Sequence, residues 1–350
     1  MFGLLSKKRI KMKLRAIRVD LPLKHVFTSS RNSVSVVRTV VVELEQDGLR
    51  GYGEAYEDAY YNVAAESMMD AIERGREAIE RYALADPVAF WRHLEPALGR
   101  NPFARSAMDV AAYDLWGKMK NRPLWRIWGT SNDSVPISSH SIGIDSVEQI
   151  NEKFKEYPDW PLYRLKLGGR HDEEMLRAVR NLTVSPFRVD VNGAWTLETA
   201  LEMLPLLREM NVETIEQPLP YGDWDGMKAL RKQCDIPLIA DESLRTEDDL
   251  EKCAECFDGV NIKLAKFGGI TPVRRLIGRA KELGLKIMMG NTVESTIGAS
   301  ATGQFAPQLD YLYSDGPLLI EKKVGYGVKL DRGRLVYPEE CGTGVRVYFR

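Results

Sequence analysis

Three acidic residues stand at the ends of short apolar segments in the second half of the chain. They are Asp190 in Val-Asp-Val-Asn, Glu216 in Ile-Glu-Gln-Pro and Asp241 in Ala-Asp-Glu-Ser. A single acid there could cap the next helix, as Asp241 alone could. On neighbouring parallel strands, about 4.8 Å apart, the three carboxylates would converge and raise one another's pKa values unless a cation compensated them. Their all-oxygen ligand set favours one Mg²⁺, with Mn²⁺ possible, over Zn²⁺.

Two lysines flank the acidic trio, Lys166 one segment before it and Lys263 one segment after it. A lysine becomes a useful base when its pKa falls from about 10.4 toward about 7–8. Arg164 would share a strand face with Lys166, and its charge opposes protonation of that lysine. If the cation chelates a substrate carboxylate, one lysine can remove the α-proton and the other can protonate the opposite face. This chemistry is racemisation or epimerisation, or elimination if a β-leaving group is present; a purely structural ion network is the alternative.

Eight short segments rich in β-branched residues predict the strands that carry these side chains. Their ends lie near residues 142, 166, 190, 216, 241, 263, 289 and 313. A spacing of about 25 residues, with a loop and a helical stretch after each segment, is typical of a parallel (β/α)₈-type barrel. Residues 13–55 alternate like strands, with a hairpin at Gln46-Asp-Gly, and residues 60–83, 87–97 and 103–121 have helical periodicity. The pattern predicts an α+β domain before the barrel.

Composition excludes several other classes of protein. The chain has 350 residues, with 49 Lys+Arg against 50 Asp+Glu, and without a dense basic block we expect no nucleic-acid partner. The apolar runs are too short for a bilayer span, so we expect no membrane partner, and the order of residues in 1–9 is the reverse of a secretory signal. Four cysteines make no disulfide framework, and Cys253 and Cys256 fall in a helical stretch where we expect a structural role. We therefore expect a cytoplasmic protein.

Taken together, these motifs resemble the enolase superfamily, muconate-cycloisomerase-like subgroup. The motifs that carry the resemblance are Lys166-Leu-Gly, Asp190-Val-Asn192, Ile215-Glu-Gln-Pro, Ala240-Asp-Glu-Ser, Asn261-Ile-Lys263-Leu-Ala-Lys-Phe-Gly-Gly269, Gly51-Tyr-Gly-Glu-Ala and Ala107-Met-Asp-Val-Ala-Ala-Tyr-Asp. The resemblance implies a (β/α)₇β TIM-type barrel with an N-terminal α+β capping domain, one Mg²⁺ per subunit and enediolate chemistry. We predict the capping domain at 1–128, the barrel at 129–320 and a segment at 321–350 that returns to the capping domain.

Within this subgroup the chain most resembles dipeptide epimerases of the L-Ala-D/L-Glu type. The resemblance implies that Lys166 and Lys263 are the acid/base pair, and that the substrate is contacted by residues of the barrel mouth and the first loop. These are Ser141, Arg164, Asn291, Tyr313 and Asp315, with Arg31 or Lys24 closing over the substrate side chain.

Two departures from the epimerase pattern bear on the substrate. Arg164-Leu-Lys166 stands where relatives have Lys-x-Lys, which keeps the positive charge. Tyr313-Ser-Asp315 stands where dipeptide epimerases have Asp-x-Asp, the pair that holds the substrate ammonium. We predict a Mg²⁺-dependent dipeptide epimerase that acts on a small carboxylate and forms a homo-oligomer. The alternatives are a lyase (a dehydratase or an o-succinylbenzoate-synthase-like enzyme), an N-acylamino-acid racemase, or a non-catalytic metal-binding protein.

Overall fold

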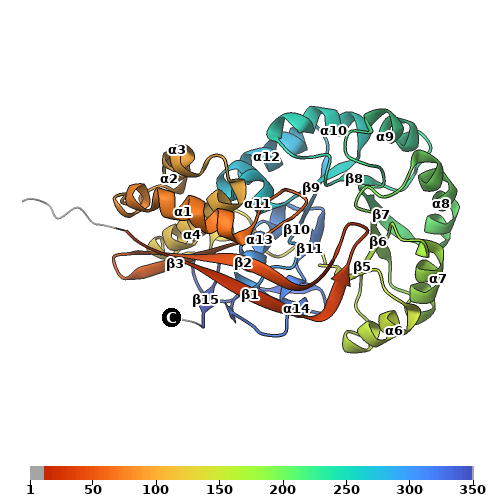
Figure 1. Ribbon diagram of the computed structural model, residues 1–350, viewed down its shortest axis with the longest axis horizontal. Helices are drawn as coiled ribbons and strands as arrows, with labels where there is room; N and C mark the ends of the chain where they lie inside the picture. The colour runs from red at the N-terminus through yellow and green to blue at the C-terminus, as the bar shows by residue number, and fades with distance from the viewer. Residues whose placement is uncertain (1–11, 349–350) are drawn as a thin grey trace, which may run out of the picture.

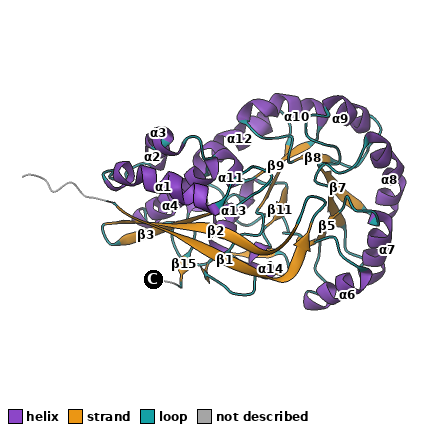
Figure 2. Ribbon diagram, viewed as in Figure 1, coloured by secondary structure: helices purple, strands orange, loops and turns teal. Residues whose placement is uncertain are grey.

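The computed structural model describes residues 12–348, so the N-terminal stretch 1–9 lies outside it. A long antiparallel sheet with its helices lies beside a ring of strands that is surrounded by further helices (Figures 1 and 2). The first body is formed by the N-terminal third of the chain, and the ring by most of the rest.

The N-terminal domain is an α+β unit, as predicted. Its sheet has the order β1 (Lys13–Thr28), β2 (Ser33–Gln46) and β3 (Leu49–Tyr56). Asp47 and Gly48 join β2 to β3 with φ of 54° and 79°, the left-handed pair that a type I′ hairpin requires. The helices are α1 (Ala65–Glu80), α2 (Pro87–His93), α3 (Glu95–Leu98) and α4 (Pro102–Met119). Helix α4 crosses β3 so closely that a Cβ on Gly53 would lie 1.9 Å from the carbonyl oxygen of Ala107.

The barrel has the eight predicted strands in sequence order, each parallel to the next. They are β4 (His140–Ile142), β5 (Tyr163–Lys166), β6 (Phe187–Asp190), β7 (Val212–Glu216), β8 (Leu238–Ala240), β9 (Gly259–Ile262), β10 (Lys286–Gly290) and β11 (Tyr311–Tyr313). A parallel bridge between Ser138 and Leu312 brings the first strand to the last. The strands are short and almost wholly buried, as parallel strands with helices outside them must be.

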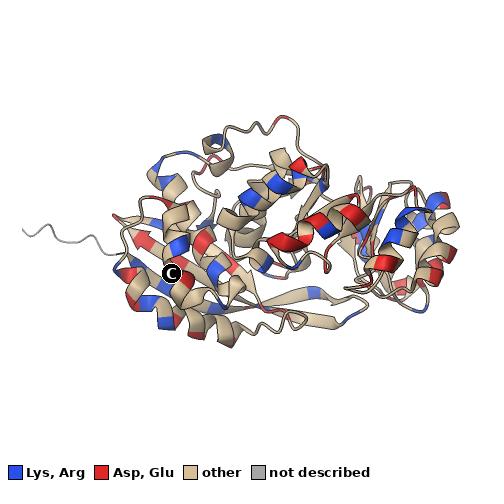
Figure 3. Cartoon of the chain, turned by 90° about the horizontal axis from the view of Figure 1, so that it is seen from above, with Lys and Arg blue, Asp and Glu red and all other residues tan. Residues whose placement is uncertain are grey.

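Helices follow the strands around the outside of the ring (Figure 2). These are α6 (Val147–Glu156), α7 (Asp172–Leu182), α8 (Leu197–Glu209), α9 (Trp224–Arg231), α10 (Leu250–Cys256), α11 (Leu264–Phe267), α12 (Ile270–Glu282), α13 (Thr296–Gly303) and α14 (Gly316–Leu319), whereas the short helix α5 (Leu124–Ile127) precedes the first barrel strand. Two 3₁₀ turns lie at Glu247–Asp249 and Ala306–Gln308. Lys/Arg and Asp/Glu are interspersed over these helices (Figure 3). In the part of the chain that the structure describes, no helix combines the length and apolar character needed to cross a membrane.

The C-terminal segment forms two small antiparallel pairs, β12 (Gly325–Tyr326) with β15 (Arg346–Val347) and β13 (Lys329–Asp331) with β14 (Arg334–Val336). Its Thr343 donates from N–H and Oγ to Asp114 of α4, at 2.8 and 2.9 Å. The domain limits at 128/129 and 320/321 stay a prediction. All four cysteines are free thiols, and Cys253 and Cys256 are buried in α10.

Candidate active site

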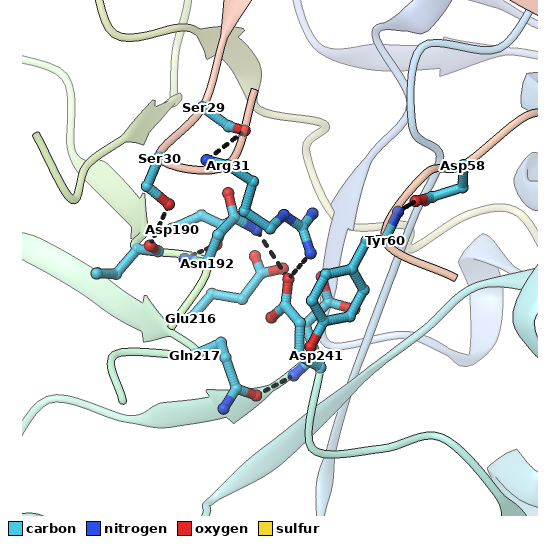
Figure 4. Close-up of polar contacts among 12 residues, drawn as sticks. Ser29, Ser30, Arg31, Asp58, Tyr60, Asp190, Asn192, Glu216, Gln217 and Asp241 are labelled. Carbon is cyan, nitrogen blue, oxygen red and sulfur yellow. Dashed lines mark hydrogen bonds and ion pairs between the residues drawn. The ribbon is translucent and has the colours of Figure 1, made fainter. Parts of the chain in front are cut away.

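The three acids converge at the carboxyl ends of neighbouring barrel strands. Asp190 pairs in register with Lys166 on one side and with Glu216 on the other, because β5, β6 and β7 are aligned without an offset at these positions. Asp241 directly follows β8, and all three carboxylates are at most 1% exposed. One oxygen from each can be chosen so that all lie within 4.8 Å of one another (Figure 4). Three buried carboxylates without a histidine or cysteine are a donor set that suits Mg²⁺.

Cationic side chains surround this acidic triad. Arg164 contacts Asp190 and also Glu216, where Nη2 lies 2.8 Å from Oε2. The Nζ of Lys166 lies 2.5 Å from Oδ2 of Asp190, and the Nζ of Lys263 lies 2.5 Å from Oδ2 of Asp241. The two lysines therefore approach the triad from different strands and at different ligands. A divalent cation on these oxygens would compete with both ammonium groups for them.

Burial and charge act differently on the two lysines. Burial lowers the pKa of Lys166, the charge of Asp190 opposes this, and Arg164 adds to the lowering, so the net shift is downward. Burial also lowers the pKa of Lys263, but the charge of Asp241, with smaller contributions from nearby tyrosines, leaves it well above its ordinary value. Burial raises the pKa of Glu216 to about 7 even though Arg164 lowers it. The prediction that Arg164 would oppose protonation of Lys166 agrees with the direction of this shift.

Four residues beside the acidic triad were not among the predicted site residues. Lys266 of α11, almost wholly buried, donates from Nζ to the carbonyl oxygen of Asp241 at 2.6 Å and to its Oδ1 at 3.0 Å. Asn261 donates from Nδ2 to Oε1 of Glu216 at 2.7 Å. The other two, Gln217 and Glu242, follow Glu216 and Asp241 directly in sequence. All four lie inside the motifs quoted above, so their position in those motifs was the available signal.

A cavity of about 1110 Å³ opens between the N-terminal domain and the barrel mouth. Most of the predicted substrate contacts line it, and so do both lysines: the set is Arg31, Ser141, Arg164, Lys166, Lys263, Asn291, Tyr313 and Asp315. Lys24 is not brought to this cavity. Its Nζ donates to the hydroxyl of Tyr157 at 2.9 Å, because β1 carries it past the mouth to α6.

Arg31 links the N-terminal domain to the barrel at the edge of the site. Its Nη1 donates to Oε1 of Glu242 at 2.6 Å, and the same oxygen accepts from Nδ2 of Asn192 at 3.0 Å. The guanidinium also lies 4.6 Å from the ring centroid of Tyr60. The first loop therefore reaches the strand ends, as expected, but the arginine's charge already has a buried carboxylate as its partner.

The last strand supplies one acid and one aromatic side chain. Asp315 accepts from the N–H of Ser141 at 2.6 Å and from its Oγ at 3.2 Å. The hydroxyl of Tyr313 accepts from Asn261 at 2.7 Å, and its ring lies 4.0 Å from the guanidinium of Arg164. Tyr313 therefore joins the network beneath the acidic triad and supplies no second carboxylate beside Asp315.

This fold and site define a class of protein, the capped parallel barrels whose strand ends carry a carboxylate triad between two lysines. Residues 146–349 match the enolase C-terminal domain-like family, and residues 11–129 match the N-terminal domain family of mandelate racemase and muconate lactonizing enzyme. The chain therefore belongs to the enolase superfamily, in the mandelate racemase/muconate lactonizing enzyme family.

The chain is similar in sequence to named relatives over nearly its whole length. It is 43% identical to an L-Ala-D/L-amino acid epimerase of Maribacter sp., over 95% of this chain and 99% of the relative. It is 33% identical to the L-Ala-D/L-Glu epimerase of Bacteroides thetaiotaomicron, over 96% of this chain and 88% of that one. Among solved structures, a dipeptide epimerase of Methylococcus capsulatus complexed with Mg and L-Arg-D-Lys superposes with a TM-score of 0.90 at 29% identity, covering 97% of this chain and all of that one.

Proposed function

We propose that this protein is a Mg²⁺-dependent dipeptide epimerase. The observation that carries the proposal is the placement of two lysines on opposite flanks of one carboxylate triad, at Asp190 and at Asp241. The names of the relatives and the Mg in the Methylococcus capsulatus complex support it.

Each residue of the site then has a role that its position allows. Asp190, Glu216 and Asp241 would hold one Mg²⁺, whose charge makes the proton α to a bound carboxylate more acidic. The amine of one lysine takes that α-proton, and the electron pair of the broken C–H bond delocalises into the carboxylate as an enediolate. The ammonium of the other lysine returns a proton to the opposite face of the α-carbon. No group is lost and nothing is oxidised, so the product is the epimer.

The remaining predicted contacts would position the substrate. Asp315 is a buried carboxylate of the cavity, and among residues 12–348 no lysine or arginine lies within 4 Å of it, so it is suited to the substrate's amino-terminal ammonium. Arg31, Ser141, Asn291 and Tyr313 line the same cavity, and Arg164 holds two of the triad's acids in place. Lys24 would act through Tyr157 rather than on the substrate.

The test is proton exchange in D₂O with a panel of L,L-dipeptides, followed by mass and NMR. The wild type should epimerise at least one dipeptide and incorporate one deuterium at the epimerised α-carbon. Lys166→Ala and Lys263→Ala should each lower epimerisation by at least about 10³-fold, because each removes one proton-transfer group. Each variant should still exchange the α-proton of one diastereomer.

The matched control is Lys286→Ala, a lysine at the start of barrel strand β10 that pairs with Asp310 and is exposed. It should leave epimerisation and exchange unchanged. Exchange of both diastereomers by Lys166→Ala would rule out the two-lysine mechanism. Turnover of N-acylamino acids but of no dipeptide would favour the N-acylamino-acid racemase instead, and release of water would favour a lyase. We also propose that the protein is cytoplasmic and forms a homo-oligomer.

A further inference from the structure

A buried histidine lies directly behind Asp315. His140, on β4 immediately before Ser141, is 3% exposed, and its Nδ1 lies 3.4 Å from Oδ2 of Asp315. This Nδ1 has no hydrogen-bond partner among the residues that the structure describes. A buried polar nitrogen without a partner is costly, and Asp315 is the acceptor within reach.

Three aromatic rings fix the orientation of this imidazole. The ring centroids of Tyr157, Trp160 and Tyr163 lie 4.7, 5.5 and 6.4 Å from that of His140. His140 also lines a small cavity of about 30 Å³ with Tyr157, a volume that suits one water molecule. The packing therefore holds Nδ1 on the side of the carboxylate.

Asp315 is the most deeply buried of the three acids that line the large cavity, at 2% exposed. The other two are half-buried: Glu57 pairs with Arg38 at 3.1 Å, and Asp58 accepts the N–H of Tyr60 at 2.9 Å. The Oδ1 of Asp315 accepts the hydroxyl of Ser141, and Oδ2 accepts its N–H. The Nδ1–H of His140 would be a third donor to this carboxylate and the second at Oδ2, and it would restrict the carboxylate to one orientation.

We propose that His140 is a positioning residue for substrate binding, whose Nδ1–H holds the carboxylate of Asp315 toward the ammonium group of the dipeptide. The inference rests on the proposed function. In this chain Tyr313 stands where dipeptide epimerases have the first acid of Asp-x-Asp, so Asp315 would have to hold the ammonium group without a second carboxylate. One acid can define the position of an ammonium group only if its own rotation is prevented.

Two polar substitutions distinguish the roles of the two imidazole nitrogens. In His140→Asn the amide nitrogen can take the place of Nδ1, whereas in His140→Gln it takes the place of Nε2. Both variants lose the aromatic ring, so they lose similar packing. His140→Phe keeps the ring shape and removes both nitrogens.

The readouts are KM and kcat for a free-amine dipeptide and the affinity for its N-acetyl derivative, with folding checked by circular dichroism. His140→Gln and His140→Phe should raise KM for the free-amine dipeptide about tenfold or more, the loss expected for a hydrogen bond to a charged group, with kcat within twofold. His140→Asn should stay within about threefold of the wild-type KM. Affinity for the N-acetyl derivative should be the same in all of them.

Equal KM values in the Asn and Gln variants, or parallel losses for the free and N-acetyl compounds, would overturn the inference while leaving the epimerase proposal intact. A wild type that turns over no dipeptide would overturn both. If the Phe variant does not fold, the comparison of Asn with Gln still decides.

Discussion

Buried carboxylates occur in two regions of this molecule, and their partners differ. At the barrel mouth, Asp190, Glu216 and Asp241 contact the side chains of arginine and lysine. Between the N-terminal domain and the barrel, Glu54 and Asp109 accept hydrogen bonds from backbone N–H groups and hydroxyls. All five acidic residues are at most 3% exposed.

The two kinds of partner suit the two regions to different roles. Backbone N–H groups are fixed in direction and cannot leave, so acids bound by them hold two bodies in one arrangement. An ammonium group on a flexible stem can be replaced by another cation, so acids bound by it can accept a metal ion. Substitutions at the mouth should therefore reduce turnover more than stability, and substitutions between the domains should do the reverse.

The largest effect should come from Glu216→Gln. The change keeps the shape of the side chain but removes the charge of one proposed metal ligand, and we expect kcat/KM to fall by about 10³-fold, or about 4 kcal/mol. The apparent unfolding temperature should stay the same or rise, because burial already raises the pKa of Glu216 to about 7. Steady-state kinetics with a Mg²⁺ titration, beside a thermal melt, measure both.

The control for this substitution lies on the same strand. Glu213→Gln changes a half-exposed acid of β7 that pairs with Arg188 at 2.6 Å, away from the mouth. It should leave kcat/KM within twofold. If Glu216→Gln kept activity within tenfold of wild type, the mouth would not be a metal site of the kind proposed.

A smaller effect, on stability, is expected from Glu54→Gln. Glu54 of β3 accepts from the N–H and Oγ of Ser295, at 3.1 and 2.6 Å, and from the N–H of Gly298 at 2.9 Å, all at the start of α13. An amide cannot accept from all of these donors and turns its own N–H₂ toward them, which should cost about 3 kcal/mol. Denaturant unfolding measures the loss.

The control on the neighbouring strand is Glu45→Gln, whose partners Lys13 and Arg50 are at the surface. It should leave the denaturation midpoint nearly unchanged. If Glu54→Gln abolished turnover without lowering stability, the assignment of turnover to the mouth and of stability to the contact between the domains would be wrong.

The spacing of residues allowed the barrel and its acidic triad to be predicted, for a simple reason. Consecutive parallel strands with similar connections put their ends in register, so positions about 25 residues apart become neighbours. The register of Lys166, Asp190 and Glu216 is the direct result. The N-terminal hairpin was also predictable, since Asp47-Gly48 is a local turn signal.

Other parts of the site depend on contacts that local patterns do not encode. His140 meets Asp315 because the barrel closes, which brings together residues 175 positions apart. Lys24 turns to Tyr157 because a strand of 16 residues carries it past the mouth. Lys266 returns to Asp241 from the short helix after β9, and its place in a motif does not say which acid it contacts.

The smallest effect is the pH dependence of the contact between α4 and α12. Asp109 accepts from the N–H and Oγ of Thr271, at 2.7 and 3.0 Å, and burial raises its pKa to about 7 although these donors lower it. The folded protein keeps this proton up to about pH 7, whereas the unfolded chain releases it near pH 4. Its contribution to stability is therefore greatest at low pH and falls as pH rises from about 4 to about 7. Between pH 5 and 8 the wild type should lose about 2–3 kcal/mol of unfolding free energy from this group. Asp109→Asn, which cannot titrate, should lack this part of the slope; parallel stability curves for the two proteins between pH 5 and 8 would show that Asp109 is charged throughout that range.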